Sequence, residues 1–149
     1  MNRSLCRIQG FSLVELIAVL LIVGILSVAA FSRIIPADSA QLQSSRDMIV
    51  AAFYSAQQLA MTRQHQVQVI TGTSTIDIRM DSNNDSNFTV DESVTVGGVA
   101  YPISFPPSQA LTTASFNYNR LGYTSGGTLQ LSQNGRLVAI EVDDTGFTR

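Results

Sequence analysis

A long run of apolar residues near the amino terminus is the feature that most limits how this chain can fold. Residues 11–31 contain only three polar side chains, those of Ser12, Glu15 and Ser27. A helix needs about 20 apolar residues to cross the hydrocarbon core of a bilayer. Residues 11–35 are therefore predicted to form a membrane-spanning helix.

The charges that flank the run predict its orientation. Arg3 and Arg7 precede it, and no acidic residue does. Cytoplasmic flanks carry the excess of basic residues, so residues 1–10 are predicted to lie in the cytoplasm and the chain beyond the run outside it. The run is longer than the apolar part of a secretory signal peptide, about 7–15 residues, which favours an anchor that is retained.

Glu15 is the exception within the apolar run. A carboxylate in the hydrocarbon core costs about 2.5 kcal/mol or more, and such residues usually have a partner. No cationic side chain lies within the run. Two alternatives follow: Glu15 is solvated at the membrane edge, or its partner comes from another chain.

The residues around Glu15 resemble the amino-terminal signature of type IV pilins and pseudopilins. Residues 9–15 read QGFSLVE, and a short basic leader and the long apolar run accompany them. The resemblance implies that a prepilin peptidase cleaves between Gly10 and Phe11 and methylates the new amino group of Phe11. It also implies that Glu15 binds the amino terminus of a neighbouring subunit during filament assembly.

Composition narrows the function further. Charged residues make up 13% of the chain, about half the usual share of a soluble domain, which argues against an ordinary soluble enzyme. The net charge is -2, so a nucleic-acid partner is not expected. The one cysteine, Cys6, lies in the expected leader of residues 1–10. Cleavage of the leader would leave a mature chain without cysteine. Many major type IV pilins close a loop with a disulfide, so the resemblance implies a minor pilin or a pseudopilin.

A second helix is predicted after the apolar run. Pro36 lacks the amide hydrogen that a helix interior needs, which predicts a kink or break. From Gln41 to about Gln64 apolar residues recur at spacings of three, four and seven, as in an amphipathic helix. Residues 36–65 are therefore predicted to be the amphipathic half of a long helix. Its predicted buried stripe consists of Leu42, Ile49, Ala52, Phe53, Ala56, Leu59 and Ala60.

After His65 the pattern changes to the period of two that is typical of strands. Asn134-Gly135 is the strongest hairpin signal in the chain. The predicted fold is α+β: a long N-terminal helix, transmembrane and then amphipathic, packed on a small antiparallel β-sheet head of residues 66–149. Strands are predicted over residues 66–71, 75–80, 88–96, 99–105, 114–120, 128–132 and 137–142.

The carboxy-terminal part carries a second resemblance. Residues 116–149 are similar to the end of H-type and FimT-like minor subunits, with an aromatic strand, a G-G-T-L-Q-L strand and a final T-G turn. Together with the acidic, asparagine-rich middle of the chain, this ending looks most like a minor pilin of the mannose-sensitive haemagglutinin type.

One loop carries a possible metal-binding pattern. The spacing of its oxygen side chains matches that of the EF-hand calcium loop, although Ser86 stands where that loop has glycine. The predicted calcium ligands are Asp81, Asn83, Asp85, Asn87 and Glu92. The alternative is a solvated turn, rich in Asp and Asn, that joins two strands.

The sequence contains no nucleophile elbow, P-loop or dinucleotide fingerprint, so no enzymatic activity is expected. The predicted function is that of a minor structural subunit of a type IV pilus. Its expected partners are a prepilin peptidase, other pilin or pseudopilin subunits and the bacterial inner membrane, with the head in the periplasm. Two alternatives stay open: a minor pseudopilin of a type II secretion system, and a membrane-tethered binding domain that does not polymerise.

Overall fold

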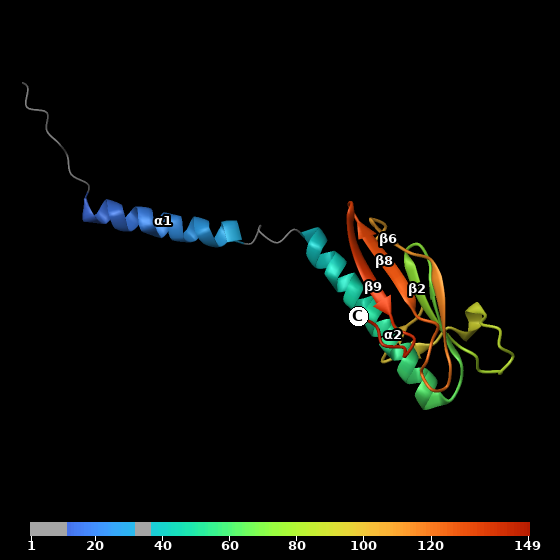
Figure 1. The fold of residues 1–149 in the computed structure, drawn as a ribbon. Helices are drawn as coiled ribbons and strands as arrows, with labels where there is room; N and C mark the ends of the chain where they lie inside the picture. Colours follow the sequence, from blue (N-terminus) through green and yellow to red (C-terminus); the bar gives the residue numbers. More distant parts are fainter. Residues whose placement is uncertain (1–11, 32–36) are drawn as a thin grey trace, which may run out of the picture. The chain divides into compact units, whose positions relative to one another are not determined.

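The computed structural model describes residues 12–31 and 37–149 of the chain (Figure 1). They fall into two compact units, residues 1–36 and residues 37–149. In the first unit the structure describes helix α1 (Leu13–Phe31). The second, called the globular unit below, contains helix α2 (Ala37–Arg63) and the β-strands. The predicted α+β class is confirmed, and α2 is the helix that packs on the sheets.

Helix α2 forms as the spacing of its apolar residues predicted. Six of the seven residues of the predicted stripe are buried, and Leu59 is half-buried at its border. The helix begins at Ala37 and ends at Arg63, within the predicted residues 36–65. Its end is marked by Gln64, which has a positive φ of 58° and donates a side-chain hydrogen bond to the carbonyl of Met61 at 2.7 Å.

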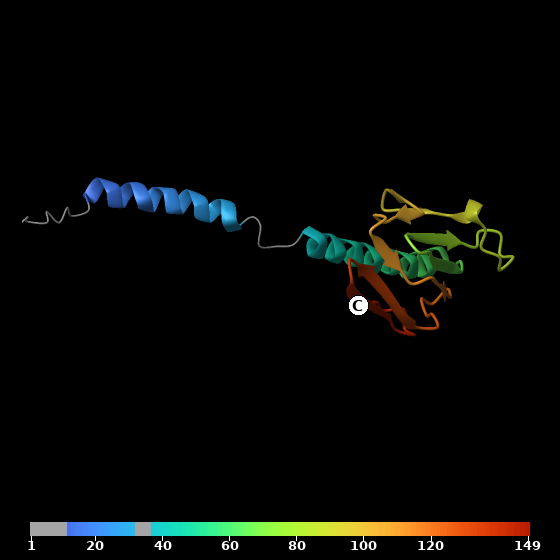
Figure 2. The same ribbon diagram turned by 90° about the horizontal axis from the view of Figure 1, so that it is seen from above.

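Three antiparallel sheets make up the rest of the globular unit. The four-stranded sheet has the order β5-β2-β1-β7 and consists of β1 (Val67–Thr71), β2 (Thr75–Met80), β5 (Ile103–Ser104) and β7 (Ala114–Tyr118). The three-stranded sheet has the order β6-β8-β9 and consists of β6 (Gln109–Leu111), β8 (Gly127–Gln133) and β9 (Arg136–Val142). Strands β3 (Thr95–Val96) and β4 (Val99–Ala100) form a separate pair. Helix α2 contacts strands of both larger sheets. Figure 2 shows the two larger sheets on different sides of the helix.

The hairpin predicted at Asn134-Gly135 is confirmed, and the strands predicted over residues 66–71 and 75–80 form a second one. Strands β1 and β2 pair from Val67 opposite Met80 to Thr71 opposite Ile76. Strands β8 and β9 pair along their whole length, with Gln133 opposite Arg136. The two residues between them, Asn134 and Gly135, have φ angles of 50° and 78°, as a two-residue turn of type I′ requires.

The segment between β2 and β6 differs from the prediction. A strand was predicted over residues 88–96, but Val90–Glu92 form a 3₁₀ helix and only Thr95–Val96 are in a strand. The Glu92 carboxylate accepts a hydrogen bond from the Thr89 amide at 3.0 Å, and this capping favours the helical turn. The strand predicted over residues 99–105 is split into β4 and β5 near Pro102, which cannot donate to a ladder.

The core lies between α2 and the inner faces of the two larger sheets. Phe53 of α2 has no exposed surface and meets Phe116 of β7 edge to face, with ring centroids 5.2 Å apart and an interplanar angle of 76°. Tyr118 is also buried, and its burial raises its pKa to about 12. Aliphatic side chains from both sheets complete the core: Val67, Val69, Ile76, Ile78, Leu129, Leu131, Ile140 and Val142.

Replacement of Phe53 by alanine is expected to destabilise the globular unit strongly. Loss of a fully buried aromatic side chain costs about 3–5 kcal/mol of unfolding free energy, because a cavity remains where the ring was. Urea unfolding of the full chain in detergent measures the effect. Tyr54→Ala is the matched control, since Tyr54 is 61% exposed on the same helix and its loss should change stability by only about 0.5 kcal/mol. Equal effects of the two variants would contradict the placement of Phe53.

Candidate functional site

The two residues of the predicted cleavage site, Gly10 and Phe11, lie outside the described residues. Glu15, the predicted assembly residue, is described and lies in the first turn of α1. The carbonyl of Ser12 accepts hydrogen bonds from the amides of Glu15 and Leu16 at 3.0 and 3.1 Å, so the helix starts directly after Ser12. Glu15 is exposed there, and a carboxylate in the first turn interacts favourably with the helix dipole.

Apart from Glu15 and Ser27, the described side chains of α1 are apolar, and they are exposed on all sides of the helix. Leu13, Val14, Leu20 and Leu26 are each more than 60% exposed. The one hydroxyl in the middle of the run, on Ser27, donates to the carbonyl of Val23 at 2.7 Å, which removes its need for an outside partner. Thus α1 offers a continuous apolar surface with a single carboxylate near its start.

Among residues 12–31 and 37–149, no helix combines the length and the apolar character needed to cross a membrane. The span over residues 11–35 therefore stays a prediction.

The loop with the calcium-like spacing forms a turn closed by its own hydrogen bonds. Asp81 is 2% exposed, and its two carboxylate oxygens accept from the amides of Asp85 and Ser86, both at 3.1 Å. Asp85 accepts from the amide of Asn87 at 2.8 Å and from the side chain of Asn83 at 2.9 Å. Without an ion, these hydrogen bonds close the loop as a turn rich in Asp and Asn.

Four of the five expected calcium ligands, Asp81, Asn83, Asp85 and Asn87, are joined by hydrogen bonds within the turn. Glu92, the twelfth residue of the pattern, caps Thr89 in the following 3₁₀ helix instead. Within the described parts of the chain, no three His, Cys, Asp or Glu side chains are grouped so that they could hold a metal ion. The calcium site therefore stays a prediction: helices flank an EF-hand loop, whereas this loop leaves from strand β2 and enters a 3₁₀ helix.

A partly buried ion pair that the sequence analysis missed fixes the next part of the loop. Asp77 and Arg79 lie two residues apart on β2, with Nε and Oδ2 2.8 Å apart. Ser93 donates to the same carboxylate oxygen at 3.0 Å, and Arg79 donates to the carbonyl of Phe88 at 2.9 Å. The alternation of polar residues along a strand gives no sign of such a pair, because the contacts with Ser93 and Phe88 depend on the path of the loop.

Gln57 is a second residue whose role was not predicted. Gln57 lies outside the predicted buried stripe of α2, which predicts a solvated side chain. Its side-chain amide nevertheless donates to the carbonyls of Gly122 and Thr145 at 3.1 and 2.8 Å. One helix residue thereby ties together the turn after β7 and the turn after β9.

The carboxy-terminal arginine is engaged by an acid. Arg149 donates to the carboxylate of Glu141 at 2.7 and 3.0 Å, and this contact raises the pKa of Arg149. The negative charge of Glu141 offsets the positive charge of Arg149 at this position.

Comparison with known proteins agrees with the pilin-like reading. The family model described as the prokaryotic N-terminal methylation motif matches residues 5–31. No curated protein matches the chain. The chain thus carries the amino-terminal motif that the residues around Glu15 predicted, and the globular unit has to be compared through its fold.

The fold is similar to that of two crystal structures of the type IV minor pilin FimU from Pseudomonas aeruginosa (strain PAO1). The structure in space group P21 has a TM-score of 0.53 and 14% sequence identity, covering 74% of this chain and 88% of FimU. The structure in space group P65 has a TM-score of 0.50 and 13% identity, covering 72% and 90%. The fold is therefore pilin-like, as predicted.

Asp81→Asn is expected to lower the unfolding free energy by about 1–3 kcal/mol, because it places an amide opposite two backbone N–H groups that need acceptors. Thermal or urea unfolding measures the loss, which should be equal with excess calcium and with a chelator. Asp91→Asn is the control, since Asp91 is exposed in the same segment and should leave stability nearly unchanged. A loss seen only in the presence of calcium would restore the metal site.

Proposed function

We propose that this chain is a minor pilin subunit, made as a precursor and assembled into a type IV pilus of the mannose-sensitive haemagglutinin type. The observation that carries the proposal is the methylation motif over residues 5–31, together with a helix whose described side chains, apart from Glu15 and Ser27, are apolar and exposed all round. Such a surface is stable only where lipid or other helices cover it. The pilin-like fold of the globular unit supports the same function.

Processing forms the first step of the proposed function. A prepilin peptidase cleaves the bond between Gly10 and Phe11 and methylates the amino group of Phe11. The apolar segment holds the precursor in the bacterial inner membrane, with the globular unit in the periplasm. The leader and its two arginines then stay on the cytoplasmic side, where basic flanks are favoured.

Assembly follows from the chemistry of Glu15. The residue is exposed in the first turn of α1, four residues after the proposed new amino terminus. In the filament, helices of neighbouring subunits replace lipid around the apolar surface, and the carboxylate pairs with the charged amino group of a neighbour. This ion pair offsets the cost of moving a carboxylate into an apolar medium.

The first test is intact mass and amino-terminal tandem mass spectrometry on protein extracted from membranes of cells with a working prepilin peptidase. The expected product starts at Phe11 and carries one added methyl group. Gly10→Val blocks access to the cleaved bond and serves as the processing-deficient control. A wild-type chain that still starts at Met1 would favour the tethered binding domain that does not polymerise.

The second test separates assembly from processing. Glu15→Val is expected to be inserted and cleaved like the wild type but to be about tenfold or more depleted from sheared filaments, because the ion pair with a neighbour is lost. Leu20→Val, a conservative change on the exposed surface of the same helix, is the control and should assemble normally. Normal incorporation of the Glu15→Val subunit would exclude the proposed role of Glu15.

A further inference from the structure

One half of strand β9 has a free hydrogen-bonding edge. The two-residue turn at Asn134 and Gly135 makes Gln133 and Arg136 a hydrogen-bonded pair. Hydrogen-bonded and non-hydrogen-bonded pairs alternate along an antiparallel ladder. Leu137, Ala139 and Glu141 belong to non-hydrogen-bonded pairs, so their amides and carbonyls point away from β8. Within residues 12–31 and 37–149, the backbone of Leu137 and Ala139 has no hydrogen-bond partner on that side.

The other half of the same edge is already covered by a strand-like segment. Glu141 and Arg149 exchange both backbone hydrogen bonds, at 2.9 and 3.0 Å, and Asp143 donates to the carbonyl of Phe147 at 2.8 Å. The chain itself therefore pairs with the outer edge of β9 in antiparallel fashion. Glu141 and Arg149 add a side-chain ion pair on top of this pairing.

The free half of the edge is short and apolar. Exposed edges are normally protected by shortness, by charged side chains, above all lysine, by proline or by a bulge. Here the two residues with free backbone groups are Leu137, which is 67% exposed, and Ala139, and the charged residue beside them is Arg136. Because neither Leu137 nor Ala139 is charged or a proline, their amides and carbonyls remain open to a further strand.

Side-chain hydrogen bonds hold this edge in place against the start of α2. Asn134 donates to the carboxylate of Asp38 at 3.1 Å, and Gln133 donates to the side chain of Gln41 at 2.8 Å. Gln109 of β6 donates in turn to Gln133 at 2.9 Å. An incoming strand would meet an edge that is already ordered, which reduces the entropy lost on binding.

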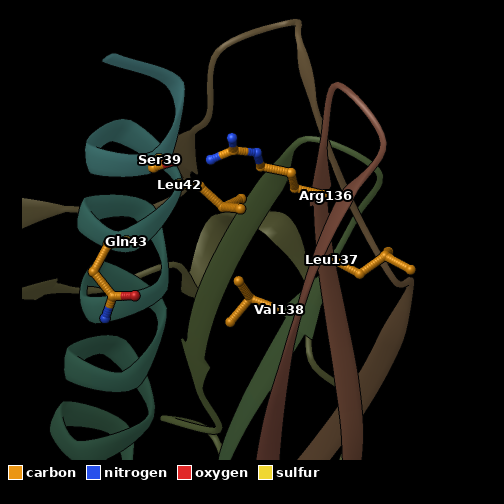
Figure 3. A pocket seen from close by; sticks show the side chains of 6 residues that line it. All are labelled: Ser39, Leu42, Gln43, Arg136, Leu137 and Val138. Carbon is orange, nitrogen blue, oxygen red and sulfur yellow. The ribbon is translucent and has the colours of Figure 1, made fainter. Parts of the chain in front are cut away.

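A hollow of about 420 Å³ lies beside the free edge. Figure 3 shows it between the first turns of α2 and the start of β9, with Leu42 and Val138 facing each other and Arg136 across its upper end. Arg136 forms no ion pair with the described residues. In strand addition the main chain supplies affinity, and pockets for alternate side chains supply specificity.

We propose that the edge of β9 at Leu137 and Ala139 binds an extended segment of a different polypeptide by strand addition, antiparallel to β9. The segment places a small aliphatic side chain in the hollow at Leu42 and Val138 and an acidic side chain opposite Arg136. A second copy of this chain fits less well: in a two-fold pairing of two β9 strands centred on Val138, Arg136 would lie opposite Ile140. The inference does not depend on processing or on pilus assembly.

The test uses the full chain in detergent and a fluorescent peptide of about eight alternating threonine and valine residues, with one aspartate in register with Arg136. Binding is measured by anisotropy, and hydrogen exchange locates the protected amides. The expected result is saturable binding that slows exchange at Leu137 and Ala139. A lysine in place of the aspartate should weaken binding to the wild type and strengthen it to Arg136→Glu.

Ala139→Pro is the decisive variant, because it removes an outward N–H without breaking a bond to β8. It should weaken peptide binding about tenfold or more. Ala139→Thr keeps the N–H and is the matched control that should bind like the wild type. Circular dichroism shows whether both variants are folded; should Ala139→Pro not fold, a peptide N-methylated at the residues that face Leu137 and Ala139 replaces it.

Three results would overturn the proposal. The first is binding that neither the proline variant nor the N-methylated peptide weakens. The second is the absence of saturable binding to the wild type. The third is a dimer, seen by light scattering, that excludes the peptide and dissociates when Ala139 is replaced by proline, because the edge would then be covered by a second copy.

Discussion

The globular unit depends on the burial of one face of α2 against two sheets at once. Ile49, Ala52, Phe53 and Ala56 have no exposed surface, and their spacing puts them on one stripe of the helix. The alanines let the strands approach closely, while Phe53 fills the space up to Phe116. Because the two larger sheets are ladders of their own, the helix is their common support.

Local patterns were sufficient where a segment's neighbours in sequence decide its structure. The buried stripe of α2 followed from spacings of three and four, and the β8–β9 hairpin followed from Asn134-Gly135, whose positive φ angles suit that dipeptide. The segment 88–96 could not be predicted in this way. Its alternation resembled a strand, but the cap at Glu92 and the distant contact of Ser93 with Asp77 decide its path.

The same distinction applies to the candidate site. The methylation motif is a linear signal, so the residues around Glu15 were sufficient to predict it. The spacing of Asp81, Asp85 and Glu92 shows where carboxylates stand in the sequence but not where their oxygen atoms point. In the structure each of the three carboxylates accepts a hydrogen bond from a backbone amide. Gln57 was placed with the solvated residues because its partners lie 65 and 88 positions away, beyond the reach of any helical period.

The contacts between the β8–β9 hairpin and the first turns of α2 have a mechanical consequence. Any tension that reaches the globular unit through Ala37 enters beside the hydrogen bonds of Asp38 with Asn134 and of Gln41 with Gln133. These bonds pass part of the load directly to the tip of the hairpin, whose ladder runs the full length of both strands. A pull along α2 is thereby shared between the helix and the three-stranded sheet, and the buried contact of Phe53 does not carry it alone.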